Sequence, residues 1–280
     1  MMTTIYHFLN ILLPFEWSQH IFMKNALLGV LLVTPMFGLM GTMVINNRMA
    51  FFSDALGHSA LTGIAIGVLL GIKQPLWAML LFACFFSVAI IIVKNANTAS
   101  TDTIIGVFSS TAVALGIAIL SLRGGFAKYS AYLIGDLLSI SATDLLMLLI
   151  AFVMVLLLWF LIFNKLLLFS VNQSLAASRG LNVRLYDYLF TIIIALTVTV
   201  SIQWVGLLII NSLLVLPAAA ARNLAGNMRQ YHAWSVGIAM VSGLAGLILS
   251  YFWGTATGAT IVVISAFFFA VTFMVKLGVK

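Results

Sequence analysis

Long apolar runs separated by short polar segments repeat along the whole chain. Runs lie near residues 25 to 45, 55 to 71, 75 to 93, 103 to 122, 144 to 163, 186 to 203, 205 to 221, 233 to 252 and 257 to 276. Each has about the 17–21 residues that an α-helix needs to cross roughly 30 Å of hydrocarbon. The pattern predicts an all-α polytopic membrane protein with about eight or nine transmembrane helices, forming a single transmembrane domain over residues 1–280.

Three segments depart from this pattern. Residues 1–22 contain Glu16 and two histidines and lack a basic leading region, so we expect an interfacial amphipathic segment and not a cleaved signal. Residues 123–143, "RGGFAKYSAYLIGDLLSISAT", are too mixed for a lipid-facing span, and residues 165–185, "KLLLFSVNQSLAASRGLNVRL", form the longest cytoplasmic interruption.

Composition agrees with a bilayer as the surrounding solvent. The chain is 64% hydrophobic and 7% charged, whereas soluble domains carry about 25% charged residues. The net charge of +7 does not indicate nucleic-acid binding, because the basic residues are scattered singly at the ends of apolar runs. With the amino terminus outside, nine of these residues are cytoplasmic and four are on the other side, which fits the positive-inside rule. Cys84 is the only cysteine, so no disulfide or thiolate cluster is available.

Asp54 and His58 are the most informative polar pair. Their spacing of four places both side chains on one face of a helix, about 5–6 Å apart at Cβ. Counted from Arg48 at the cytoplasmic mouth, the two residues lie about 9 and 15 Å into the membrane. An ionisable residue at that depth indicates function by default, and a carboxylate beside an imidazole can hold a cation. The alternative is a helix-start Asp in the interface, with His58 satisfied by a carbonyl group.

A stripe of small residues follows the pair. Gly63, Gly67 and Gly71 recur every fourth residue, and Ser59 lies one turn before them. Such a stripe allows another backbone to approach closely. The spacing leaves open whether that backbone belongs to the same subunit, to a second copy or to the wall of a pore.

Residues 165–185 have the signals of a short cytoplasmic helix. Ser174 can cap it and Gly180 can end it. A helix of this kind can receive a push from a soluble partner, although a loop without a partner fits equally well. The chain has no GxxxxGK[ST] stretch, so energy from ATP must arrive through a second protein.

Four stretches together resemble a known family. They are "RMAFFSDALGHSALTGIAIG" (48–67), "AYLIGDLLSISATDL" (131–145), the Ala176-to-Gly180 spacing in "SLAASRGLNV", and "WVGLLIINSLLVLPAAAAR" (204–222). In this order they are similar to the permease subunit of bacterial zinc/manganese ABC importers. The resemblance implies the fold of cobalamin and siderophore importer permeases, in the bacterial cytoplasmic membrane. It also implies a homodimer, two cytoplasmic ATPase subunits and an extracytoplasmic solute-binding protein as partners.

The resemblance also assigns the metal residues. The family's D-x-x-x-H element falls on Asp54 and His58, which implies a metal site inside the membrane. "GDLL" falls on residues 135–138, so Asp136 is expected near the extracytoplasmic end of the path, contacting the metal or the binding protein. Ser53 departs from the glycine common before the aspartate, which concerns the local backbone and not the ligands.

The ATPase-coupling residues follow from the same resemblance. The family's A-x-x-x-G element falls on Ala176 and Gly180, and the coupling region includes Arg179 and Asn182. These residues are expected to dock a short helix in the ATPase subunit.

In the homodimer that the resemblance implies, two copies of the pair supply two carboxylates and two imidazoles. That set suits tetrahedral Zn²⁺, and with added water it suits Mn²⁺ or Fe²⁺. We expect no permanently bound cofactor, a transported divalent metal ion as substrate, and ATP only through the partner subunit. The alternative is an ion-coupled secondary metal carrier, for which no inverted repeat is visible. An intramembrane metallohydrolase needs a motif such as HExxH, and Glu16, the only glutamate, is not in one.

Overall fold

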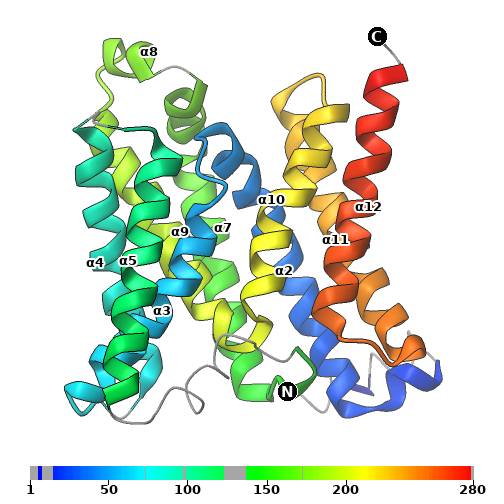
Figure 1. The fold of residues 1–280 in the computed structure, drawn as a ribbon. Helices are drawn as coiled ribbons and strands as arrows, with labels where there is room; N and C mark the ends of the chain where they lie inside the picture. Colours follow the sequence, from blue (N-terminus) through cyan, green and yellow to red (C-terminus); the bar gives the residue numbers. More distant parts are fainter. Residues whose placement is uncertain are drawn as a thin grey trace. The chain divides into compact units, whose positions relative to one another are not determined.

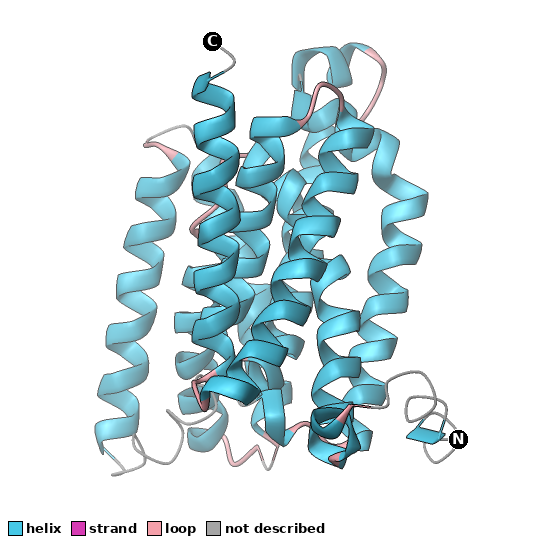
Figure 2. Cartoon of the chain, turned by 90° about the vertical axis from the view of Figure 1, so that its right-hand side faces the viewer, coloured by secondary structure: helices cyan, strands magenta, loops and turns pink. Residues whose placement is uncertain are grey.

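The structure is a computed structural model that describes residues 6–7, 15–72, 74–96, 99–122, 137–171 and 173–278. None of the described residues lies in a strand (Figure 2). The elements are η1 (Glu16–Gln19), α2 (Ile21–Asn46), α3 (Phe52–Leu69), α4 (Pro75–Asn95), α5 (Thr101–Leu122), η2 (Leu137–Ser139), α7 (Ala142–Val171), α8 (Gln173–Ser178), α9 (Val183–Val205), α10 (Leu207–Leu224), α11 (Met228–Trp253) and α12 (Thr257–Gly278).

The expected number of spans is confirmed. Eight of the described helices are long and apolar enough to cross a membrane. The remaining run, near residues 205 to 221, corresponds to α10, whose apolar stretch Ile209–Leu224 is shorter. Within the expected amino-terminal segment, residues 1–22, Glu16–Gln19 form η1 and α2 begins at Ile21. Residues 1–5 and 8–14 lie outside the described residues, and the interfacial placement of this segment stays a prediction.

The chain folds into two compact units. Unit 1 comprises residues 1–42, 136–153 and 204–280, and unit 2 comprises residues 43–135 and 154–203. The single transmembrane domain over residues 1–280 stays a prediction.

In unit 1, helices pack closely where small residues meet. A Cβ on Gly38 of α2 would lie 3.0 Å from the Cα of Val236 in α11, so these two backbones are nearly in contact. Ser235 donates a hydrogen bond of 2.6 Å to the carbonyl oxygen of Gly38 at the same crossing. Gly246 of α11 lies even closer to α12, since a Cβ there would be 2.7 Å from the Cα of Ile261. Small residues allow this approach inside a bilayer, where dispersion and polar contacts hold helices together.

Unit 2 is built around α3, with α4 and α5 beside it (Figure 1). In α3, 72% of the spanning window is buried inside the chain, against 28% for α5. The uncovered side chains of α5 include Val107, Leu115 and Ile117, which suit contact with lipid. The helix that carries Asp54 and His58 is therefore the core helix of its unit.

Candidate metal site and coupling region

The connection between α2 and α3 places Asp54 in the first turn of α3. Helix α2 ends in a Schellman motif, in which Arg48 N–H donates to Ile45 at 3.2 Å and Met49 N–H donates to Val44 at 3.0 Å. Arg48 takes the left-handed conformation with φ 56°, and Met49 is fully buried. Helix α3 then begins at Phe52. A carboxylate in the first turn is favourable because it faces the positive end of the helix dipole.

The side chains of Asp54 and His58 meet on α3. His58 Nε2 lies 3.6 Å from Asp54 Oδ2, and the two side chains are 41% and 46% exposed. Ser53, Leu56 and Ser59 beside them are fully buried. The pair is therefore the accessible part of a turn whose remaining side chains the chain itself covers.

The separation of the two atoms suits a shared metal ion. Two donors that each lie about 2.0–2.2 Å from one tetrahedral ion are roughly 3.4 Å apart. A separation of 3.6 Å is too long for a strong hydrogen bond but close to that ligand spacing. The pair can therefore supply two ligands to one cation with little movement.

The described residues of one chain supply only some of the ligands that a metal ion needs. Among the described residues, no group of three or more His, Cys, Asp or Glu side chains lies close enough to hold an ion. Asp136, the third predicted metal residue, lies outside the described residues. The described donors therefore leave ligands to be supplied from elsewhere, such as water or a second copy.

The glycine stripe of α3 packs within the chain. A Cβ on Gly63 would lie 3.0 Å from the Cα of Met79, and one on Gly67 would lie 2.4 Å from the Cβ of Ala78, both in α4. Gly71 instead ends the helix with φ 73° and has open space around it. Of the alternatives left open by the sequence, packing inside one subunit is the one observed for Gly63 and Gly67.

Helix α5 holds α3 on another side. The hydroxyl group of Thr62 donates a short hydrogen bond to the carbonyl oxygen of Ala112. Gly116 lies against the backbone of Thr62, since a Cβ there would be 3.0 Å from the Thr62 nitrogen. The backbone of α3 is therefore fixed on two sides while the Asp54–His58 pair remains accessible.

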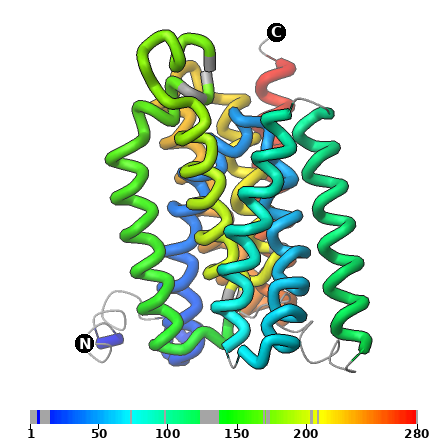
Figure 3. Tube along the Cα trace, turned by 90° about the vertical axis from the view of Figure 1, so that its left-hand side faces the viewer, coloured from blue at the N-terminus to red at the C-terminus, as the bar shows by residue number. Residues whose placement is uncertain are grey.

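The short helix predicted within residues 165–185 is present as α8, between α7 and α9 (Figure 3), and its coupling role stays a prediction. It ends in a second Schellman motif: Gly180 N–H donates to Ala177 at 2.9 Å and Leu181 N–H donates to Ala176 at 3.1 Å. Gly180 has φ 76°, which explains the Ala-to-Gly spacing, because the residue four positions after Ala176 must be left-handed. Helix α8 begins at Gln173, so Ser174 lies inside the helix and the predicted cap at that residue is wrong.

The next helix begins almost at once. The side chain of Asn182 accepts a hydrogen bond of 3.1 Å from the N–H of Leu185, which is N-capping geometry for α9. Ala176 is fully buried, while Arg179 and Gly180 are exposed. The four predicted coupling residues therefore form one sharp corner with an exposed tip.

Two polar contacts of α9 were not assigned from the sequence. Asp187 is buried and forms an ion pair with Lys94 at the end of α4. The Lys165 ammonium lies 5.8 Å from the ring centroid of Tyr186. Asp187 stands inside an apolar run, and this was the available signal, because a carboxylate in a spanning segment needs a partner.

The sequence also gave no indication of one buried polar contact in unit 1. Thr42 Oγ1 lies 2.8 Å from Nδ1 of His232, and both residues are buried. The two residues are separated by 190 positions, so no local pattern connects them.

Eight long apolar helices among the described residues define a multi-pass membrane protein. Residues 19–276 match the model of the ABC 3 transport family. The chain belongs to this family. It is a multi-pass protein of the cytoplasmic membrane and a transport component, not an enzyme.

Relatives and a solved structure agree with this assignment. The chain is 34% identical to the high-affinity zinc uptake system membrane protein ZnuB of Haemophilus influenzae, over 88% of this chain and 95% of the relative. It is 30% identical to the manganese import system permease protein ScaB of Streptococcus parasanguinis, over 92% of each. The solved structure of PsaBC from Streptococcus pneumoniae in complex with Fab matches with a TM-score of 0.78 and 28% identity, over 96% of this chain and 95% of that chain. These matches confirm the expected all-helical importer fold and favour an ABC importer over the secondary carrier.

Proposed function

We propose that this chain is the permease subunit of an ATP-driven importer, and that it carries a divalent transition metal ion past Asp54 and His58 at the axis of a homodimer. The observation that carries the proposal is the pair itself, two metal-binding side chains 3.6 Å apart and accessible on an otherwise buried helix turn. Relatives at 30–34% identity are named for zinc and for manganese uptake.

The second copy completes the coordination. A twofold axis beside α3 brings two Asp54–His58 pairs to one ion, which gives two oxygen and two nitrogen ligands. This set favours tetrahedral Zn²⁺ first, and Mn²⁺ or Fe²⁺ when water adds further oxygen ligands. Because the side chains of one copy remain more than two-fifths exposed, the ion can be released without unfolding the turn.

Energy enters at the corner between α8 and α9. The exposed tip at Arg179 and Gly180 is the surface that two cytoplasmic ATPase subunits contact, and an extracytoplasmic binding protein delivers the metal. Closure of the ATPase dimer then changes which side of the membrane reaches Asp54 and His58. Asp136 is assigned to the extracytoplasmic entrance.

Transport by purified components tests the metal site. The permease is reconstituted in proteoliposomes with its ATPase and binding protein, and Zn²⁺ and Mn²⁺ uptake is measured for Asp54→Ala and His58→Ala. Uptake is expected to fall about a hundredfold or more, since even outer-shell partners of metal sites typically change affinity 10–100-fold.

Asp102→Ala is the matched control, because Asp102 is also a first-turn acidic residue of a unit 2 helix and is exposed. It is expected to retain uptake. Normal uptake by both the Asp54 and the His58 variants, with the complex assembled, refutes the metal site.

A further inference from the structure

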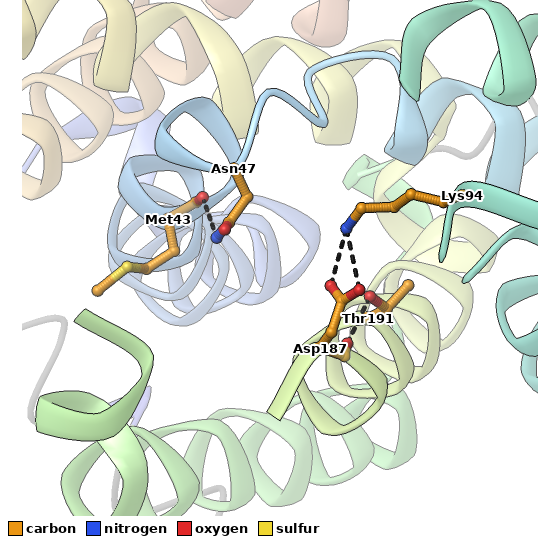
Figure 4. Close-up of polar contacts among 5 residues, drawn as sticks. All are labelled: Met43, Asn47, Lys94, Asp187 and Thr191. Atoms are coloured by element: carbon orange, nitrogen blue, oxygen red, sulfur yellow. Dashed lines mark hydrogen bonds and ion pairs between the residues drawn. The ribbon is translucent and has the colours of Figure 1, made fainter. Parts of the chain in front are cut away.

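A buried ion pair joins α4 to α9 in unit 2. Lys94 Nζ lies 2.8 Å from Oδ1 and 3.1 Å from Oδ2 of Asp187, so one ammonium group contacts both carboxylate oxygens (Figure 4). The side chains are only 15% and 5% exposed. Lys94 lies in the last turn of α4, and Asp187 lies near the start of α9.

Stability alone does not explain this pair. Desolvation of two buried charges largely offsets their attraction, and apolar side chains of similar size often stabilise a protein as well or better. What an ion pair adds is a directional link between two particular groups. The pair is therefore better understood from the elements that it connects.

At one end the pair connects to the coupling corner. Asp187 lies five residues after the capping residue Asn182, about 7.5 Å along α9. The first turns of α9 are regular, and Thr191 Oγ1 donates to the Asp187 carbonyl oxygen at 2.7 Å. A displacement of the α8–α9 corner therefore moves Asp187 with it, because the intervening residues belong to one capped helix.

At the other end the ion pair connects, through α4, to α3, the helix that carries Asp54 and His58. Lys94 belongs to α4, which packs against α3 at Gly63 and Gly67 with nearly touching backbones. Close packing of this kind transmits displacement without much compression. Helix α3 carries His58 less than two turns before Gly63, and Asp54 one turn before His58.

We propose that Lys94 and Asp187 form the positioning pair that transmits movement of the α8–α9 corner to α3, and so couples the ATPase to the metal site. This proposal rests on the proposed function for its input, because the ATPase is what displaces the corner. The physical requirement for such coupling is an element that both sites bias, and here that element is the α4–α9 junction.

A labelling experiment tests the link without using metal. In a Cys84→Ala background, Ile66→Cys places a thiol on α3 two turns beyond His58, at a partly exposed position. The complete complex with its ATPase is reconstituted, and the rate of maleimide labelling is compared with and without ATP and vanadate. Lys94→Met combined with Asp187→Leu removes both charges and leaves neither one buried alone.

With the ion pair intact, nucleotide is expected to change the labelling rate about tenfold, within the usual range of allosteric coupling. With the apolar pair the change is expected to disappear, while ATP hydrolysis continues. Lys165→Met is the matched control: it removes another cation that contacts α9, and it is expected to keep the response. If the apolar pair prevents assembly, the charge-swapped variant Lys94→Asp with Asp187→Lys takes its place, and it is expected to keep the response.

Three results overturn the link: a normal response in the apolar pair, an equal loss in Lys165→Met, or no response with the ion pair intact. Metal uptake is measured in the same vesicles. An intact permease that shows the nucleotide response but transports no metal overturns the proposed function and leaves the link standing.

Discussion

The hydroxyl group of Thr42 fixes the tautomer of His232. Thr42 Oγ1 donates its single proton to the carbonyl oxygen of Leu39 at 2.7 Å, so towards His232 Nδ1, 2.8 Å away, it acts only as an acceptor. Nδ1 of His232 therefore carries the proton. The imidazole is held by a donor–acceptor chain that begins at a backbone carbonyl of α2 and ends in α11.

This relationship predicts the effect of removing the acceptor. Thr42→Val keeps the shape of the side chain but leaves the buried Nδ1–H without that partner, which typically costs about 1–3 kcal/mol. We expect a lower thermal midpoint of the purified permease in detergent. Thr42→Ser, which retains the hydroxyl group, is the control and is expected to stay near the parent value. Equal stability of the valine and serine variants contradicts the assigned bond.

The close approach of α3 and α4 gives a second prediction. Gly67→Ala places a Cβ 2.4 Å from that of Ala78, so the helices must separate, at a cost of typically about 1–3 kcal/mol. The reciprocal change Ala78→Gly provides the missing space, and the double variant is expected to recover most of the loss. Thermal unfolding of the four proteins in a double-mutant cycle measures this coupling.

Gly106→Ala in α5 is the matched control for helix propensity. No atom lies within 4 Å of a Cβ at that position, and alanine is favoured over glycine in a helix interior by about 1 kcal/mol. We therefore expect no loss of stability. A Gly67→Ala protein as stable as Gly106→Ala contradicts the packing of α3 on α4.

A feature was predictable from the sequence when all of its residues lie in one helix or at its end. The Asp54–His58 contact follows from helical geometry, and the end of α8 follows from the need for a left-handed residue at Gly180. The partner of the glycine stripe was not predictable, because the pattern shows that a backbone comes close and not which one. The same holds for Asp187, since its partner Lys94 is 93 residues away.

Helix boundaries were less predictable where a residue other than glycine takes the left-handed conformation at the helix end. Three helix ends in the described chain have glycine at the left-handed position, namely Gly71, Gly180 and Gly254. The end of α2 has Arg48 there instead, and arginine carries no such signal. As a result, the sequence did not mark the boundary between α2 and α3. Helix α3 begins at Phe52, three residues before the predicted run of residues 55 to 71.

Arg48 gives a third prediction. A non-glycine residue in the left-handed region is strained by roughly 1 kcal/mol, so Arg48→Gly is expected to raise the free energy of unfolding by about that amount. Gly71→Arg is the reverse change at an equivalent helix end with open space, and it is expected to lower stability similarly. Denaturant or thermal unfolding in detergent measures both. A less stable Arg48→Gly protein means that the guanidinium group makes a contact that offsets the strain.

The fourth prediction separates backbone conformation from bulk at Gly180. No atom lies within 4 Å of a Cβ there, but φ is 76°, so the folded chain has room for a side chain whose backbone accepts the left-handed region. Asparagine accepts it and valine does not. Gly180→Val is expected to disrupt the α8–α9 corner, so that ATP is hydrolysed with about tenfold less metal transported per ATP, while the complex still assembles.

Gly180→Asn is the control that decides the cause. If the role of Gly180 is to set the turn, asparagine retains the metal-to-ATP ratio, because its amide group points into open space and its backbone keeps the Schellman bonds to Ala176 and Ala177. If asparagine and valine lower the ratio equally, the glycine is required because the ATPase surface lies against it. Both ratios equal to the parent value contradict a coupling role for the corner, since a region that transmits force must respond when its geometry is changed.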